Sequence, residues 1–129
     1  QIDCVACSNC CKNTSTGLEN EDIKRISKYL GVSDKEFINK YLTKNKSGRW
    51  VLDSRPCKFL TANGCSIYEV RPRACREYPH TNKPEFTSRL IIMIENASIC
   101  PVVFEILEKL KSKYAEEFKE YLSFMPDNW

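Results

Sequence analysis

The sequence predicts a small, mainly helical α+β domain organised around a multi-cysteine metal site. Eight cysteines occur in 129 residues, and four of them fall between positions 4 and 11. Apolar residues recur at helical spacing in several stretches, and the pair Asn63-Gly64 separates two short apolar runs. We therefore expect about four helices with a short β-hairpin or strand element, in a single domain spanning residues 1–129.

The first cysteine group, Cys4, Cys7, Cys10 and Cys11, has the spacing of a metal-binding motif. On an α-helix these four side chains would lie within an arc of about 120°, because successive residues are about 100° apart. A straight helix would nevertheless separate Cys4 from Cys11 by about 10 Å along its axis. The sulfurs of a tetrahedral zinc site lie only about 4 Å apart. Either this segment contains a turn, or its thiols bind more than one metal.

The other four cysteines are spread over the rest of the chain, and we expect the fold to bring them to the first group. A closed zinc site and a four-iron cluster each take four thiolates. Eight ligands therefore predict two such sites or one polynuclear cluster, and hence more than one metal per chain. The predicted metal ligands are Cys4, Cys7, Cys10, Cys11, Cys57, Cys65, Cys75 and Cys100.

A disulfide framework is the alternative interpretation of an even number of cysteines. Against it, the cysteine density is below that of stapled miniproteins, and amphipathic helices supply a core. Reduced thiols predict a reducing compartment, the cytoplasm. No apolar run has the length of a membrane span. The net charge of +3 is too small to predict nucleic-acid binding by itself. A protein partner is left open.

Two consecutive helices are expected after the cysteine motif. The first runs from about Asn20 to Leu30, with acidic residues in its first turn and Gly31 closing it. The second begins at Ser33, and Glu36 three residues later completes a capping box. We expect these helices to form a scaffold. The apolar side of the second helix is predicted at Phe37, Ile38, Tyr41 and Leu42.

Short elements are expected in the middle of the chain. Residues 50–52 predict a strand. A hairpin turning at Asn63-Gly64 would bring Cys57 and Cys65 close together. A short helix is predicted over residues 73–78, with Pro72 at its start.

The last third of the chain is expected to hold a strand and the longest helix. The continuous apolar run over residues 89–94 predicts a buried strand. Cys100 then precedes a helix predicted over about residues 101–124, where apolar residues recur at helical spacing and Pro101 occupies a favourable first position.

The arginines are unevenly placed. Six of the seven lie between residues 49 and 89, interleaved with Cys57, Cys65 and Cys75. Guanidinium groups close to a thiolate site would offset its negative charge and donate hydrogen bonds there. The alternatives are a solvated basic face and a patch that binds phosphate or carboxylate groups. These arginines are Arg49, Arg55, Arg71, Arg73, Arg76 and Arg89.

Several of these motifs together carry a resemblance to a known family. They are Cys4-x-x-Cys7-x-x-Cys10-Cys11, the segments 56–60 and 64–79, and Cys100-Pro101. In this combination the chain resembles the CxxCxxCC zinc- or iron-chelating domain family, the YkgJ-like cysteine-cluster proteins. The resemblance covers about residues 4–101. It implies a small domain with eight metal-ligating cysteines.

All-thiolate ligation suits both zinc and an iron or iron–sulfur site, with zinc slightly favoured because it needs no assembly machinery. Three functions are compatible with such a site. They are a metal-binding domain with a structural metal, a redox or methyl-transfer enzyme using an iron–sulfur cluster, and a metal storage or delivery protein. The single histidine, His80, provides no Ser/His/Asp set. No catalytic residue is therefore assigned, and enzyme activity is left open. His80 is either a ninth ligand or a loop histidine.

Overall fold

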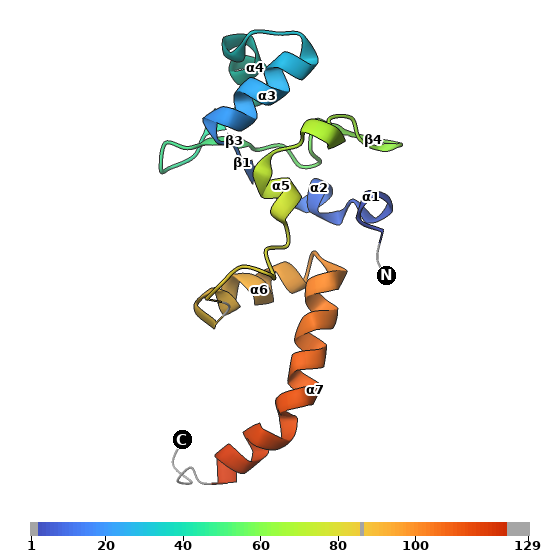
Figure 1. The fold of residues 1–129 in the computed structure, drawn as a ribbon, viewed down its shortest axis with the longest axis vertical. Coiled ribbons are helices and arrows are strands. Elements are labelled where there is room, and N and C mark those ends of the chain that lie inside the picture. Colours follow the sequence, from blue (N-terminus) through green and yellow to red (C-terminus); the bar gives the residue numbers. More distant parts are fainter. Residues whose placement is uncertain (1–2, 86, 124–129) are drawn as a thin grey trace. The chain divides into compact units, whose positions relative to one another are not determined.

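The computed structural model describes residues 3–85 and 87–123. The chain divides into two compact units, Gln1–His80 and Thr81–Trp129, and each unit is described by itself. The described structure is mainly helical with short antiparallel strands, as the sequence predicts (Figure 1). Among the described helices, none combines the length and the apolar character that crossing a membrane requires. The assignment of residues 1–129 to a single domain stays a prediction.

The cysteine motif folds as two short helices, α1 (Cys4–Cys7) and α2 (Asn9–Asn13). Ser8 lies between them in the left-handed region, with a φ of 50°. A left-handed residue cannot continue a right-handed helix, so the chain changes direction here. These two helices are one reason why the described residues hold more α-helices than the four predicted.

The two predicted scaffold helices are confirmed as α3 (Asn20–Leu30) and α4 (Asp34–Tyr41). At the start of α3 the Glu19 N–H donates to the Asp22 carboxylate over 3.1 Å, and Gly31 ends the helix with a φ of 69°. At the start of α4 the Ser33 N–H donates to the Glu36 carboxylate over 2.8 Å. The capping box predicted at Ser33 is therefore present.

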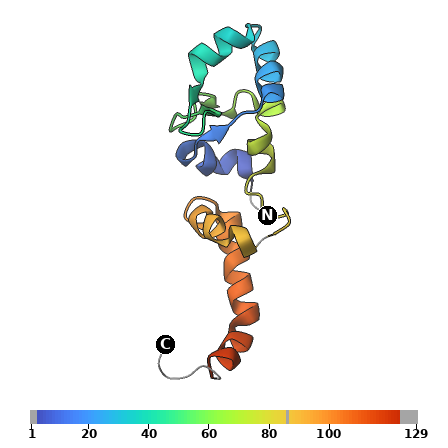
Figure 2. The ribbon, with the colours of Figure 1, turned by 90° about the vertical axis from the view of Figure 1, so that its left-hand side faces the viewer.

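A three-stranded antiparallel sheet forms beside these helices in the order β1-β3-β2. Its strands are β1 (Thr16–Gly17), β2 (Thr43–Lys44) and β3 (Trp50–Leu52), and β3 confirms the predicted strand. Val51 pairs with Gly17 on one side and with Thr43 on the other. The helices α3 and α4 lie on one side of this sheet, and α1, α2 and α5 (Arg73–Glu77) lie on the other (Figure 1, Figure 2).

The predicted hairpin is present as β4 (Leu60–Thr61) and β5 (Gly64–Cys65). Leu60 pairs with Cys65 in this two-stranded sheet. A 3-10 helix, η1 (Tyr68–Val70), leads from the hairpin to α5. The short helix predicted over residues 73–78 is confirmed except for its last residue, and Pro72 serves as its N-cap.

The hydrophobic core of the first unit lies between α3, α4 and the hairpin. Phe37 and Ile26 are completely buried. The rings of Tyr41 and Phe59 lie 4.9 Å apart, and both contact the Phe37 ring. Cys57 and Cys65 pack against this core, so two of the thiols lie at its edge. The buried members are Leu18, Ile23, Ile26, Phe37, Leu42, Leu52, Phe59 and Ile67.

The second unit consists of a 3-10 helix, η2 (Thr87–Arg89), and two α-helices, α6 (Leu90–Ala97) and α7 (Pro101–Ser123). The helices α6 and α7 pack against each other, with Met93 and Val103 buried. The predicted long helix is confirmed as far as Ser123, and residue 124 lies outside the described residues.

The buried strand predicted over residues 89–94 is wrong. This segment is helical, and Ile91, Ile92 and Ile94 are exposed while Met93 is buried. A short continuous apolar run fits a buried strand and a helix equally well. It contains no pattern of apolar and polar residues that would show the period of a strand or of a helix. Packing against α7 then decides in favour of the helix.

Candidate metal centre

The first cysteine group is shaped by hydrogen bonds at both ends of α1. Asp3 caps the helix, because its carboxylate accepts from the N–H groups of Val5 and Ala6 over 2.9 and 3.2 Å. At the other end the buried Ser8 hydroxyl donates to the Val5 carbonyl over 2.6 Å. These bonds stabilise the break between α1 and α2. The sequence left two alternatives for this segment, a turn or thiols that bind more than one metal. The turn is confirmed, and it is compatible with binding of more than one metal.

The hairpin brings Cys57 and Cys65 to α2. The Leu60 N–H donates to the Cys57 carbonyl over 3.0 Å, and Leu60 pairs with Cys65 across the hairpin. The Cys57 N–H donates to the Cys11 carbonyl over 2.7 Å, which ties the hairpin to the early motif. The sequence therefore predicted correctly that the hairpin brings Cys57 and Cys65 together.

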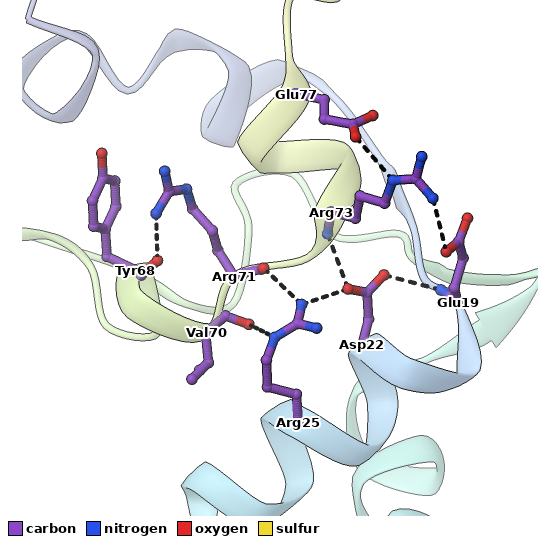
Figure 3. A network of polar contacts seen from close by, with 8 residues as sticks. All are labelled: Glu19, Asp22, Arg25, Tyr68, Val70, Arg71, Arg73 and Glu77. Carbon is purple, nitrogen blue, oxygen red and sulfur yellow. Dashed lines mark hydrogen bonds and ion pairs between the residues drawn. The ribbon is translucent and has the colours of Figure 1, made fainter.

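Cys75 is positioned by a polar network that connects α3 with the start of α5 (Figure 3). The Asp22 carboxylate accepts from the Arg73 N–H over 3.0 Å and pairs with Arg25 over 2.5 Å. Arg25 in turn donates to the carbonyls of Val70 and Arg71 over 3.4 and 3.1 Å. We call this set of contacts the Asp22–Arg25 latch. It holds both sides of the turn that precedes α5, and α5 carries Cys75.

The latch is electrostatically satisfied although Asp22 is buried. Burial by itself would raise the pKa of Asp22. Hydrogen bonds from the Glu19 N–H, the Arg25 guanidinium and the Arg73 N–H outweigh this effect and hold its pKa below the usual value. Asp22 is therefore a carboxylate at neutral pH, and it anchors the turn before α5 as a charged acceptor.

Five thiols of the first unit are electrostatic neighbours, and we call them the five-thiol cluster: Cys10, Cys11, Cys57, Cys65 and Cys75. A hydrogen bond from Cys11 lowers the pKa of Cys10 to about 6, and the same bond raises the pKa of Cys11. Burial, followed by the charges of the neighbouring thiols, raises the pKa of Cys57 and takes that of Cys75 to about 11. The Thr16 hydroxyl lies 3.6 Å from the Cys75 sulfur.

The other three predicted ligands are Cys4, Cys7 and Cys100. Cys4 is exposed and Cys7 is half-buried on α1, which packs beside β5. Cys100 belongs to the second unit, where it is buried directly before α7 and its N–H donates to the Asn96 carbonyl over 2.7 Å. All eight cysteines are free thiols, without disulfide bonds.

His80 ends the first unit and has a φ of 63°. Its N–H donates to the Glu77 carbonyl over 2.7 Å, and its ring meets the edge of the Tyr78 ring at 6.1 Å. It lines a polar pocket with Arg49, Arg73 and other residues. A role for His80 as a ninth ligand stays a prediction.

The arginines contact carboxylates, carbonyls and an aromatic ring. Arg73 pairs with Glu77 and Glu19, and Arg55 with Asp53. The Arg71 guanidinium lies 3.8 Å from the centre of the Tyr68 ring and donates to the Tyr68 carbonyl over 2.7 Å (Figure 3). These contacts favour a role in building the turn around α5. No sequence pattern indicated Asp22 or Thr16 as part of this region, because their partners lie far away along the chain.

The chemistry of the five-thiol cluster fits zinc and iron, since both metals bind thiolates. Within residues 3–85 and 87–123, however, no three Cys, His, Asp or Glu side chains lie close enough together to hold a metal ion. The thiols are thus neighbours without forming a coordination sphere. A multi-cysteine metal site as the organising centre of the fold is accordingly a proposal.

The fold and the thiols define a small, mainly helical, cysteine-rich class of protein, with eight free cysteines of which five are electrostatic neighbours. The family model of the CxxCxxCC zinc- or iron-chelating domain matches residues 3–100, and the chain belongs to this family. The resemblance inferred from the cysteine motifs is therefore confirmed. No curated protein and no solved structure matches the chain.

Proposed function

We propose that this chain is a metal-binding protein whose eight cysteines hold a polynuclear or paired zinc or iron(–sulfur) site. The observation that carries the proposal is the five-thiol cluster, in which α2, the hairpin and α5 bring five sulfurs within electrostatic reach of one another. Like-charged thiolates repel one another, and a bound cation would remove that repulsion. Five thiols also exceed the four ligands of one closed zinc site.

To form a coordination sphere, the thiols of the cluster would have to move mainly by side-chain rotation. The backbone is already fixed by the Cys57–Cys11 hydrogen bond and by the Asp22–Arg25 latch. Metal binding would then require the sulfurs to converge by side-chain rotation, with small shifts of α1. Cys4 and Cys7 on α1 would complete the ligand set in the first unit. Cys100 is the eighth proposed ligand, and its assignment rests on the sequence alone.

Elemental analysis of protein purified and kept without oxygen tests this function. We expect about two or more metal ions per chain, from the number of thiolates that each site takes. Zinc is the slightly favoured metal, and the reducing cytoplasm is the proposed compartment because it keeps thiols reduced. Visible absorbance that is lost on exposure to air would instead identify an iron–sulfur cluster and favour the enzyme alternative. Metal-free protein with four disulfide bonds would contradict the proposal.

Single substitutions test the ligand set. Cys57→Ser and Cys75→Ser should lower the amount of bound metal, whereas Ser66→Ala, an exposed position next to Cys65, should leave it unchanged. Cys100→Ser tests the ligand from the second unit separately. If Cys100→Ser retains the full metal content while Cys57→Ser and Cys75→Ser lose metal, the site belongs to the first unit alone.

The role of the metal follows from what its removal does. A structural metal predicts that strong chelation abolishes the helical circular-dichroism signal, because binding free energy is then folding free energy. Helicity that survives complete metal removal would favour storage or delivery, in which the metal is exchanged with a partner.

A further inference from the structure

The Thr16 hydroxyl lies 3.6 Å from the Cys75 sulfur, within hydrogen-bonding reach of a proposed metal ligand. The two residues are 59 positions apart in the sequence and belong to β1 and α5, which pack against each other. Within residues 3–85 and 87–123 the Thr16 hydroxyl has no other hydrogen-bond partner. The contact with the sulfur is therefore the one polar interaction of this hydroxyl in the described part of the chain.

The backbone on each side of this contact is fixed by bonds that involve neither of the two side chains. Thr16 belongs to β1, which pairs with β3 in the antiparallel sheet. The Cys75 N–H donates to the Pro72 carbonyl over 3.0 Å, in the first turn of the helix whose start the Asp22–Arg25 latch holds. The sheet and the latch therefore bring the hydroxyl and the sulfur together.

The Cys57 thiol, in the same five-thiol cluster, receives its hydrogen bonds from the backbone. Burial raises the pKa of Cys57, and hydrogen bonds from the N–H groups of Phe59 and Leu60 oppose that effect. A backbone donor of this kind survives most substitutions, because every residue except proline has an N–H group. Thr16 offers Cys75 a donor from a side chain, so a single substitution can remove it.

The direction of the hydrogen bond is set when Cys75 binds a metal. A hydroxyl and a protonated thiol can each donate to the other. Cysteine binds a metal as the thiolate, which has lost its proton and can only accept. The Thr16 hydroxyl must then be the donor. A hydrogen bond donated to the sulfur stabilises its negative charge and fixes the orientation of the ligand.

We propose that Thr16 is a positioning residue of the metal site, whose hydroxyl donates a hydrogen bond to the metal-bound Cys75 sulfur. This inference rests on the proposed function, because it requires Cys75 to bind the metal. Thr16 acts through the ligand and does not touch the metal itself. Loss of a group that hydrogen-bonds to a metal ligand typically weakens metal binding about 10–100-fold. We expect about tenfold for Thr16, since its hydroxyl is uncharged.

Titration of the whole chain with cobalt(II), without oxygen, tests the proposal. Cobalt(II) bound to thiolates has a sulfur-to-metal charge-transfer absorption, whose energy reports the charge on the sulfurs. Thr16→Val removes the hydroxyl but keeps the shape and the strand preference of a β-branched side chain. Without the hydrogen bond the sulfur electrons are less tightly held, so the absorption should move to longer wavelength. Competition with a chelator should show about tenfold weaker cobalt binding.

Two further variants separate the hydrogen bond from a general effect on the fold. Thr16→Ser keeps the hydroxyl and should restore the wild-type absorption and affinity. Thr14→Val is the matched control, because the Thr14 hydroxyl donates to the Cys10 carbonyl over 2.7 Å and not to a sulfur. Its absorption should stay at the wild-type wavelength.

The outcomes distinguish this inference from the proposed function. Wild-type protein that is isolated without metal and binds no cobalt would overturn both. If the wild type binds cobalt, an unchanged absorption and affinity in Thr16→Val would overturn the inference alone. The same holds if Thr16→Ser loses as much as Thr16→Val, or if Thr14→Val shifts the absorption equally.

Discussion

The Cys57 N–H donates to the Cys11 carbonyl over 2.7 Å, so the segment that leads into the hairpin is fastened to the end of the cysteine motif by a backbone bond. This bond places Cys57 and Cys65 beside Cys10 and Cys11. The Asp22–Arg25 latch fixes the start of α5, which carries Cys75. The thiols are therefore brought together by ordinary backbone and carboxylate hydrogen bonds.

Asp22→Asn should destabilise the first unit. The substitution removes the charge of a carboxylate that is 3% exposed and leaves Arg25 without its ion pair. We expect a loss of about 2–4 kcal/mol in the free energy of unfolding, measured by urea denaturation. Asp53→Asn removes an exposed pair with Arg55 at 3.3 Å and should cost about 0–1 kcal/mol. Equal effects of the two substitutions would show that the latch is unimportant.

The pH dependence of stability should show the lowered pKa of Asp22. A carboxyl group with a lowered folded-state pKa stabilises the fold fully above its unfolded value, about 3.9, and loses this effect as the pH falls through the folded value. The free energy of unfolding of the wild type should thus exceed that of Asp22→Asn by a constant amount from neutral pH to about pH 5. This difference should become smaller below about pH 4. Acid would release a bound metal from both proteins alike, so the difference between their free energies of unfolding isolates the carboxyl group. A difference that grows in acid would contradict this assignment.

Metal binding should release protons at pH 7. Burial raises the pKa of Cys75 to about 11 and also raises that of Cys57, so both are protonated, whereas the hydrogen bond from Cys11 lowers the pKa of Cys10 to about 6. Metals bind thiolates, so at least about two protons per chain should appear on binding. Calorimetry in buffers of different ionisation enthalpy measures this number. Cys75→Ser should release about one proton fewer, and metal binding without proton release would contradict the prediction.

Gly64→Ala should displace α1 from the hairpin. Gly64 has a φ of 97°, and a Cβ there would lie 2.9 Å from the Val5 side chain. We expect the positive φ and the clash together to cost more than the positive φ alone, which is about 1–2 kcal/mol. Gly48→Ala is the control, because Gly48 has a φ of 76° and nothing within 4 Å of its Cβ position. The double substitution Val5→Ala with Gly64→Ala should recover the part due to the clash. Equal melting temperatures for Gly48→Ala and Gly64→Ala would disprove the contact.

Features whose causes lie within a few residues were predicted correctly from the sequence. The capping box of α4 links Ser33 to Glu36, three residues apart. The end of α3 likewise depends on one residue, Gly31, in the left-handed conformation. The hairpin around Asn63 follows from a turn between two short runs. The apolar run now forming α6 was misassigned because its own residues fit two structures, and its packing partner α7 lies outside the run.

The sequence by itself determined the family, the identity of the eight thiols and the elements that carry most of them, because residue type and local spacing are sufficient for these. Only the tertiary structure decided that the motif turns at Ser8, that Asp22 anchors the start of α5, and that Arg49 lines a pocket with Glu19 and Glu77. The physical reason is the separation along the chain between the residues that interact. Capping and turn formation involve neighbouring residues, whereas a buried carboxylate or a charged pocket depends on partners that folding brings from distant parts of the chain.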